Sequence, residues 1–108
     1  MLKRILESIE KIREIERQEV TIALQSKFGV KTKEEVDTYF NHKVEIETED
    51  GYIYQGILRD YKYMIPRHPI ETGYFVLEEP SRTHPHPRDL NTTIKVFYRE
   101  VKNIYKLL

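Results

Sequence analysis

Two histidines separated by one residue, His84 and His86, are the side chains best placed to bind a metal. Imidazoles are ligands for Zn and Ni, and the alternating prolines of this segment hold it extended, which places both rings on one side of the chain. The other histidines, His42 and His68, lie elsewhere in the sequence. Because no cysteine or cluster of carboxylates accompanies the pair, we expect a surface loop without a metal.

No group of residues has the pattern of a catalytic centre. The chain has no cysteine, no glycine loop able to cradle a phosphate and no nucleophile motif. Its acidic pairs, Glu47 with Glu49 and Glu78 with Glu79, have the spacing of solvated strand and turn residues. We therefore expect a protein that is not an enzyme and needs no cofactor.

Length and composition limit the remaining classes of protein. The 108 residues suffice for one compact domain with an appendage, and eight Tyr and four Phe can fill its core. Lys plus Arg equal Asp plus Glu at 18 each, so the net charge favours neither nucleic acid nor a membrane. The absence of cysteine and of a membrane-length apolar run indicates an intracellular (cytoplasmic) protein. Abundant Lys, Glu, Ile and Tyr is similar to the composition of thermophile proteins.

The first predicted element is a long amphipathic helix over residues 2–28. Its apolar residues recur at steps of three and four, and Gly29 is suited to end it. Glu16 and Glu19 stand where a continuous heptad would have apolar side chains, which disfavours a long coiled coil. Two arrangements remain open: the stripe packs on the protein's own barrel, or it forms a short contact with helices of other molecules. The stripe begins with Leu2, Ile5, Leu6, Ile9, Ile12 and Ile15.

Beyond residue 31 the pattern predicts a short helix followed by five strands. Thr32-Lys-Glu-Glu35 is a capping-box sequence that opens the short helix. From Lys43 apolar and charged residues alternate, as in a strand with one wet face, and Asp50-Gly51 predicts a tight hairpin. The first four predicted strands cover residues 43–49, 52–61, 74–77 and 94–98, and residues 101–108 are predicted to form a short turn and the last strand. The predicted long loops cover residues 62–73 and 78–92.

Gly56, in the middle of the second strand, predicts a sharp bend or bulge that lets a short sheet curl. The predicted fold class is therefore α+β and mostly β, with N-terminal helices followed by a five-stranded, strongly bent antiparallel barrel. We divide the chain into an N-terminal amphipathic helix extension, residues 1–31, and a β-barrel with its short N-terminal helix, residues 32–108.

The first hairpin resembles the first sequence motif of the Sm and like-Sm proteins, a family of small β-barrels that includes archaeal Sm-like members. The matching run is Val44-x-Ile46-x-x-x-Asp50-Gly51-x-x-Tyr54-x-Gly56-x-Leu58-x-x-Tyr61, and the similarity extends from about Glu35 to Tyr105. The segment from Ile94 to Ile104 resembles the second motif and keeps its Arg99, with Glu100 in place of glycine. The resemblance implies a divergent Sm-like barrel whose edge strands pair between subunits in a ring.

The same resemblance implies that two loops hold RNA. Aromatic side chains stack on bases and cations meet phosphates. The candidate nucleic-acid-binding residues are Tyr63, Met64, Arg67 and His68 on the first loop, completed by Arg99 and Lys102 from the second. Lys62 and Pro66 stand where the family has the Asp and Asn of its uridine pocket. In the alternative interpretation, Tyr63 and Met64 cover the barrel core and Arg67 is solvated.

The sequence thus predicts a non-catalytic Sm-like protein that binds RNA, or else single-stranded DNA, as a homo-oligomer. The alternative is a protein-interaction or assembly module that uses the barrel and the N-terminal helix without nucleic acid. Self-association is expected through barrel edge strands or the N-terminal helix, and no membrane partner is expected.

Overall fold

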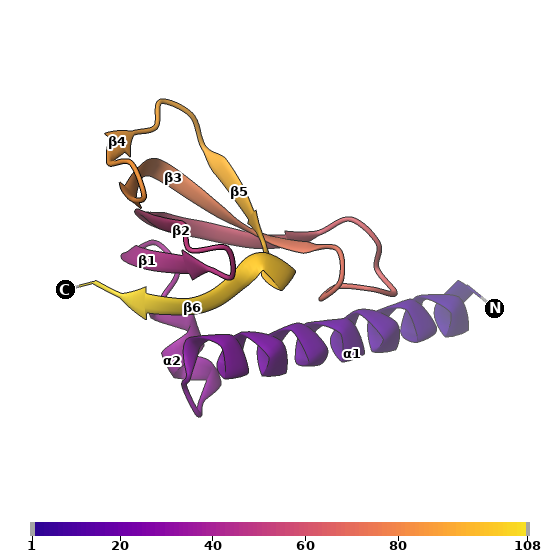
Figure 1. Cartoon of the computed structure of the whole chain (residues 1–108). Coiled ribbons are helices and arrows are strands. Elements are labelled where there is room, and N and C mark those ends of the chain that lie inside the picture. Colours follow the sequence, from indigo (N-terminus) through magenta and orange to yellow (C-terminus); the bar gives the residue numbers. More distant parts are fainter. Residues whose placement is uncertain (1, 108) are drawn as a thin grey trace.

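The computed structural model describes residues 2–107, in which two helices precede a curled antiparallel sheet. In chain order the elements are α1 (Leu2–Phe28), α2 (Lys33–Asp37), β1 (Lys43–Thr48), β2 (Ile53–Tyr63), β3 (Gly73–His84), β4 (Arg88–Asp89), β5 (Ile94–Phe97), the 3₁₀ turn η1 (Tyr98–Glu100) and β6 (Val101–Lys106). The sheet lies over the C-terminal half of α1, and the N-terminal half extends beyond it (Figure 1). The molecule is therefore elongated, with extents of 57 × 26 × 22 Å.

The sheet has the order β4-β3-β2-β1-β6, and β5 pairs with β3 beside β4. Every strand pair is antiparallel. The predicted strongly bent antiparallel architecture is confirmed, with the two-residue β4 as an addition. Within the described residues β5 pairs only with β3 and β6 only with β1, so each of these two strands keeps one edge without a strand partner.

The first part of the predicted loop at residues 78–92 is wrong, because β3 continues to His84 and β4 follows. The prediction relied on the prolines of this segment. Pro80 is accommodated because the β2–β3 register shifts beside Gly56 and forms a bulge. At a bulge the strand does not need the main-chain N–H that proline lacks. Glu79 takes a positive φ of 48° next to it. The bend predicted at Gly56 is thus confirmed. Pro80, which suggested a loop, lies next to Gly56 on the neighbouring strand.

The core lies between the inward face of the curled sheet and the C-terminal half of α1. On β1 the predicted alternation is confirmed, since Val44, Ile46 and Thr48 are buried. The Phe28 ring stacks on Tyr39, with ring centroids 4.3 Å apart, and this contact joins α1 to the segment after α2. The buried cluster consists of Leu24, Phe28, Val36, Val44, Ile46, Leu58, Phe75, Leu77, Val96, Val101 and Ile104.

Three short-range sequence patterns predicted a helix end, a helix cap and a turn, and the structure confirms each of them. Gly29 ends α1 with a φ of 68°, and its N–H donates to the Ser26 carbonyl. The Thr32 hydroxyl oxygen accepts from the Glu35 N–H at 3.2 Å and caps α2. Gly51 has a φ of 90° in the turn between β1 and β2. These turns set the directions in which the helices and the first hairpin meet.

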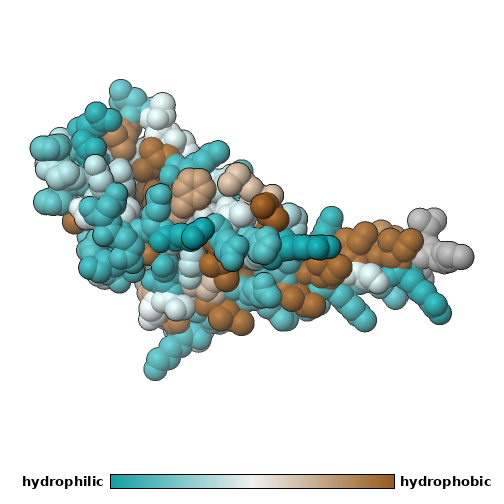
Figure 2. All heavy atoms as spheres, turned by 45° about the vertical axis from the view of Figure 1, so that its right-hand side comes forward, coloured by the Kyte–Doolittle hydropathy of each residue, from teal (hydrophilic) through white to brown (hydrophobic). Residues whose placement is uncertain are grey.

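The two halves of α1 differ in their packing. Ala23, Leu24 and Phe28 are buried, so the C-terminal half packs on the protein's own barrel across the predicted boundary at residue 31. At 1.5 Å per residue the 27-residue helix is about 40 Å long, and its N-terminal half extends beyond the sheet (Figure 1). The free half carries exposed apolar side chains, visible in brown on the protruding arm in Figure 2: Ile5, Leu6, Ile9, Ile12 and Ile15. Among residues 2–107, no helix has the length and apolarity to cross a membrane.

Candidate nucleic-acid interface

The two segments predicted to bind nucleic acid leave the sheet at the same end. The β2–β3 loop, residues 64–72, enters β3 next to Tyr74, and Tyr74 lies opposite Phe97 at the end of β5. The turn η1 follows immediately. The Tyr61 and Tyr98 rings meet edge to face, with centroids 6.2 Å apart, and so join the end of β2 to η1. Pairing of β3 with β5 therefore brings the start of η1 to the end of β2 and the start of β3.

The β2–β3 loop is held by the phenol of Tyr61. Its hydroxyl donates to the Pro69 carbonyl at 2.7 Å, and a Cβ on Gly73 would overlap both of these groups. Burial raises the pKa of Tyr61 well above its ordinary value, with a smaller contribution from Tyr98, so the phenol stays protonated and keeps its donor. Across the loop, the Thr72 hydroxyl donates to the His68 carbonyl at 2.6 Å. Hydrogen bonds therefore hold the loop to Tyr61 at the end of β2 and close it on itself.

The predicted residues of this loop divide between the helix and solvent. The Tyr63 hydroxyl donates to the Glu16 carboxylate on α1 at 3.3 Å, and burial together with that carboxylate raises the pKa of Tyr63. Met64 is 64% exposed, so the interpretation in which it covers the core does not hold. Arg67 and His68 are exposed as well, and His68 lies 3.3 Å from the carboxylate of its loop neighbour, three residues on. Met64 and Arg67 are therefore accessible to a ligand, whereas Tyr63 is engaged by α1.

The two predicted residues of the second segment have different surroundings. Arg99 is exposed on η1, the turn that leads from the end of β5 to the start of β6. Lys102 lies on β6, and its ammonium group is 3.5 Å from the carboxylate of Glu47 on β1, so its charge is already opposed. The structure thus places Arg99 on the turn between β5 and β6 and Lys102 on the β1–β6 ribbon.

Lys27 is a cation near this end that sequence reasoning missed. Its ammonium group lies 4.5 Å from the centre of the Tyr98 ring, in a cation–π contact beside η1. Lys27 belongs to the last turn of α1 and precedes Tyr98 by 71 residues in the sequence. No short-range pattern could have indicated this contact, because it depends on how α1 docks.

The histidines considered as metal ligands do not gather with other ligands. Among residues 2–107, no three His, Cys, Asp or Glu side chains form a group that could hold a metal ion. His84 ends β3, and the main-chain carbonyl of His86 accepts a hydrogen bond from the Arg82 side chain at 3.0 Å. The segment serves to connect β3 and β4.

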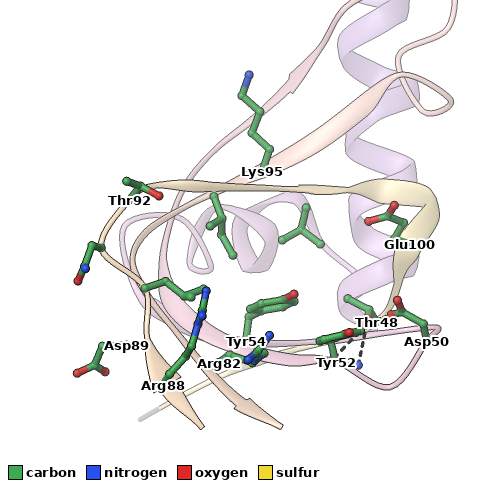
Figure 3. Close-up of a pocket in the computed structure, with 14 residues that line it drawn as sticks. Thr48, Asp50, Tyr52, Tyr54, Arg82, Arg88, Asp89, Thr92, Lys95 and Glu100 are labelled. Carbon is green, nitrogen blue, oxygen red and sulfur yellow. Dashed lines mark hydrogen bonds between the residues drawn. The ribbon is translucent and has the colours of Figure 1, made fainter. Parts of the chain in front are cut away.

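A second concave site was not predicted and lies at the other end of β2 and β3. A cavity of about 600 Å³ opens there, between the start of β2, the end of β3 and β5 (Figure 3). Tyr52 and Tyr54 belong to the strand predicted over residues 52–61, for which no site was predicted. Arg82 and Arg88 were assigned to a loop, so their pairing across β3 and β4 was not foreseen.

Comparison with known proteins concerns the whole barrel. No protein-family model and no curated protein matches the chain. Among solved structures it is similar to an Sm-like archaeal protein from Pyrobaculum aerophilum, with 17% identity, a TM-score of 0.51 and alignment over 69% of this chain and 50% of that one. It is similar to a heptameric archaeal Sm protein, with 18% identity, a TM-score of 0.50 and coverage of 67% and 94%.

A third similar structure is the P. aerophilum SmAP1 heptamer, with 18% identity, a TM-score of 0.50 and coverage of 67% of this chain and 86% of that one. The chain thus spans about half the length of the first of these proteins and most of the other two. At such identities the likeness concerns the fold.

Proposed function

We propose that this chain, which shares the Sm-like fold of these archaeal proteins, is a non-catalytic RNA-binding protein that acts as a homo-oligomer. The supporting observation is the pair of free strand edges on β5 and β6. An open edge is a template for pairing with another chain, and pairing of two different edges builds a ring when the rotation closes. Two of the similar proteins are heptamers.

RNA binding is supported by exposed side chains on the β2–β3 loop and on η1. Arg67 and Arg99 are exposed cations suited to phosphates, and Met64 presents an apolar surface suited to a base. Each subunit offers few such groups, so a useful affinity depends on repetition of the site around an oligomer. Because the chain carries no net positive charge, we expect binding to be modest and to weaken as salt rises.

Fluorescence anisotropy with a labelled oligouridine tests this proposal. We expect saturable binding that weakens as salt is raised, and a roughly tenfold loss in the Arg67→Ala, Arg99→Ala double variant. Lys33→Ala removes an exposed cation from α2 and should leave binding unchanged. Binding that is absent at low salt, or equal in the double variant and the Lys33→Ala control, would contradict the proposal.

Light scattering tests the homo-oligomer. We expect a mass of several chains that persists at low and at high salt, because strand pairing depends on main-chain hydrogen bonds more than on charge. Added oligouridine should increase that mass by the weight of the bound RNA. A monomeric mass at both salt concentrations would contradict the proposed assembly.

A second function, that of an assembly module, is favoured by the free half of α1. Its exposed apolar stripe runs from Ile5 to Ile15, and the midpoint lies near residue 10. Two copies that pair antiparallel about this midpoint bring the two stripes into full contact and place Arg4 of one copy beside Glu16 of the other. Antiparallel pairing also opposes the two helix dipoles favourably. The occupant of this surface is therefore a second copy of the chain.

A further inference from the structure

The cavity of about 600 Å³ at the start of β2 has an aromatic wall. Tyr54 lies opposite Ile46 on β1, so its ring points to the inside of the curled sheet. The Tyr52 ring stacks beside it, with centroids 6.2 Å apart and planes within 10°. Burial raises the pKa of the Tyr54 phenol, so this wall is uncharged at neutral pH. Two aligned rings offer a flat apolar surface to a planar ligand.

Two arginines stand next to this wall without an acidic partner. Arg82 on β3 is directly opposite Arg88 on β4, and like charges in this relation destabilise a sheet. Within the described part of the chain, neither arginine forms an ion pair with a carboxylate. The Arg82 Nε donates to the His86 carbonyl at 3.0 Å, and its guanidinium lies 5.8 Å from the centre of the Tyr52 ring. Two arginines at paired positions of adjacent strands are suited to bind an anion with several oxygens.

The opposite end of the cavity is acidic. Figure 3 shows Asp50 and Glu100 beyond Tyr52, on the side away from the two arginines. Asp50 accepts a hydrogen bond from the Thr48 hydroxyl and keeps further lone pairs free. In the same view Lys95 points away from the cavity, and its ammonium group lies 5.0 Å from the centre of the Tyr74 ring. The cavity therefore has Arg82, Arg88 and Asp89 at one end, aromatic rings in the middle and the carboxylates of Asp50 and Glu100 at the other.

We propose that this cavity binds a nucleoside monophosphate. The phosphate lies between Arg82 and Arg88, the base lies against Tyr52 and Tyr54, and N–H groups of the base face the acidic end. The volume is within the range of about 300–1,000 Å³ that small-molecule sites occupy. Guanine presents a ring N–H and an amino group side by side, which two carboxylate oxygens can accept, so guanosine monophosphate is the best probe. The site is separate from the β2–β3 loop and does not depend on RNA binding there.

Isothermal titration with guanosine monophosphate tests the site. We expect one nucleotide per chain, and a roughly tenfold loss of affinity in each of Arg82→Gln and Arg88→Gln, since each removes a charge-assisted hydrogen bond. Lys95→Gln is the matched control, because it removes a lining cation that points away, and its affinity should stay within about twofold. Guanosine and inorganic phosphate should each bind more weakly than the nucleotide.

Thermal unfolding separates this role from a purely structural one. Because Arg82 and Arg88 repel each other in the absence of an anion, Arg88→Gln should leave the melting temperature of the free protein unchanged or raise it, while weakening nucleotide binding. No binding of guanosine monophosphate by the folded protein would overturn the proposal. Equal binding in Arg88→Gln and the wild type would overturn it too, as would inorganic phosphate binding as tightly as the nucleotide.

The source of the phosphate is distinguished by two RNA probes of the same sequence, with and without a 5′-phosphate. If the site takes RNA ends, the phosphorylated probe gains affinity and that gain disappears in Arg88→Gln. If it takes free nucleotides, the two probes bind alike and guanosine monophosphate still binds. Unphosphorylated oligouridine should bind Arg88→Gln as it binds the wild type, so failure of this site and failure of the loop site are told apart.

Discussion

Tyr61 joins the core, η1 and the β2–β3 loop. Its ring packs edge to face on Phe75 in the core and on Tyr98 of η1, and its hydroxyl reaches the Pro69 carbonyl. This arrangement requires a glycine at position 73, where no Cβ fits. A single phenol thereby couples the core to the segment that carries Met64, Arg67 and His68.

The raised pKa of Tyr61 predicts a loss of stability in alkali. A group whose folded pKa lies above its unfolded value of 10.0 contributes stability that is complete below that value and is lost as pH rises through the folded pKa. We expect the free energy of unfolding, measured with urea, to fall more steeply above about pH 10 in the wild type than in Tyr61→Phe. Parallel pH profiles of the two proteins would contradict this assignment.

Gly73→Ala should destabilise the protein by about 1–3 kcal/mol, the usual cost of forcing extra atoms into a packed site. The new methyl group would overlap the Tyr61 hydroxyl and the Pro69 carbonyl. Urea unfolding measures the change, and the same substitution in a Tyr61→Phe background should cost somewhat less, because the overlap with the hydroxyl oxygen is gone while those with the ring Cζ and the Pro69 carbonyl remain. An equal cost in both backgrounds would mean that the ring and the Pro69 main chain set the penalty.

Strand edges and helix halves, rather than single residues, determine how this protein can assemble. The β1–β6 ribbon has a defined hydrogen-bonding side, because the Leu107 N–H donates to the Lys43 carbonyl at 2.9 Å. N–H groups alternate in direction along an antiparallel strand, so those of Ile104 and Lys106 face the free edge of β6. The edge is therefore available to a neighbouring strand without any rearrangement.

Lys106→Pro should reduce the oligomer to smaller species while the barrel stays folded. Proline removes the outward N–H of residue 106 and leaves the hydrogen bonds between β6 and β1 in place. Light scattering gives the mass and circular dichroism the fold, and Lys106→Ala is the matched control that removes only the charged side chain. Retention of the wild-type mass by Lys106→Pro would exclude the β6 edge as an interface.

The free half of α1 allows the alternative route of assembly to be tested separately. Charges introduced by the double substitution Ile9→Glu, Ile12→Glu fall on exposed positions, so the folded barrel should keep its circular dichroism spectrum and its urea midpoint. If α1 mediates assembly, the mass falls. Leu24→Glu changes the buried half of the same helix and should unfold the protein. An unchanged mass in the Ile9, Ile12 variant would exclude the helix as an interface.

The whole molecule separates its possible functions in space. The long axis of 57 Å comes from α1, whose free arm extends from one side of the barrel. The β2–β3 loop and the cavity at the start of β2 lie at opposite ends of the β2–β3 pair, and the free edges of β5 and β6 lie along its open side. RNA binding, nucleotide binding and assembly can therefore be tested by variants that do not overlap.

Local features of this fold were readable from the chain because short-range energetics govern them. The cap at Thr32, the glycine that ends α1 at Gly29, the Asp50-Gly51 turn and the alternation along β1 each depend on residues within a few positions of one another. The bend at Gly56 belongs with them. Together they indicated the order of elements and the bent barrel.

Contacts between distant segments account for everything that was missed. The extension of β3 past Pro80 depends on a bulge against β2, and the pairing of Arg82 with Arg88 depends on that extension. The hydrogen bond from Tyr63 to Glu16 joins residues 47 positions apart and removes one predicted ligand-binding side chain from the loop surface. Such contacts follow from how the sheet curls on α1, since side chains meet there through packing that no sequence period encodes.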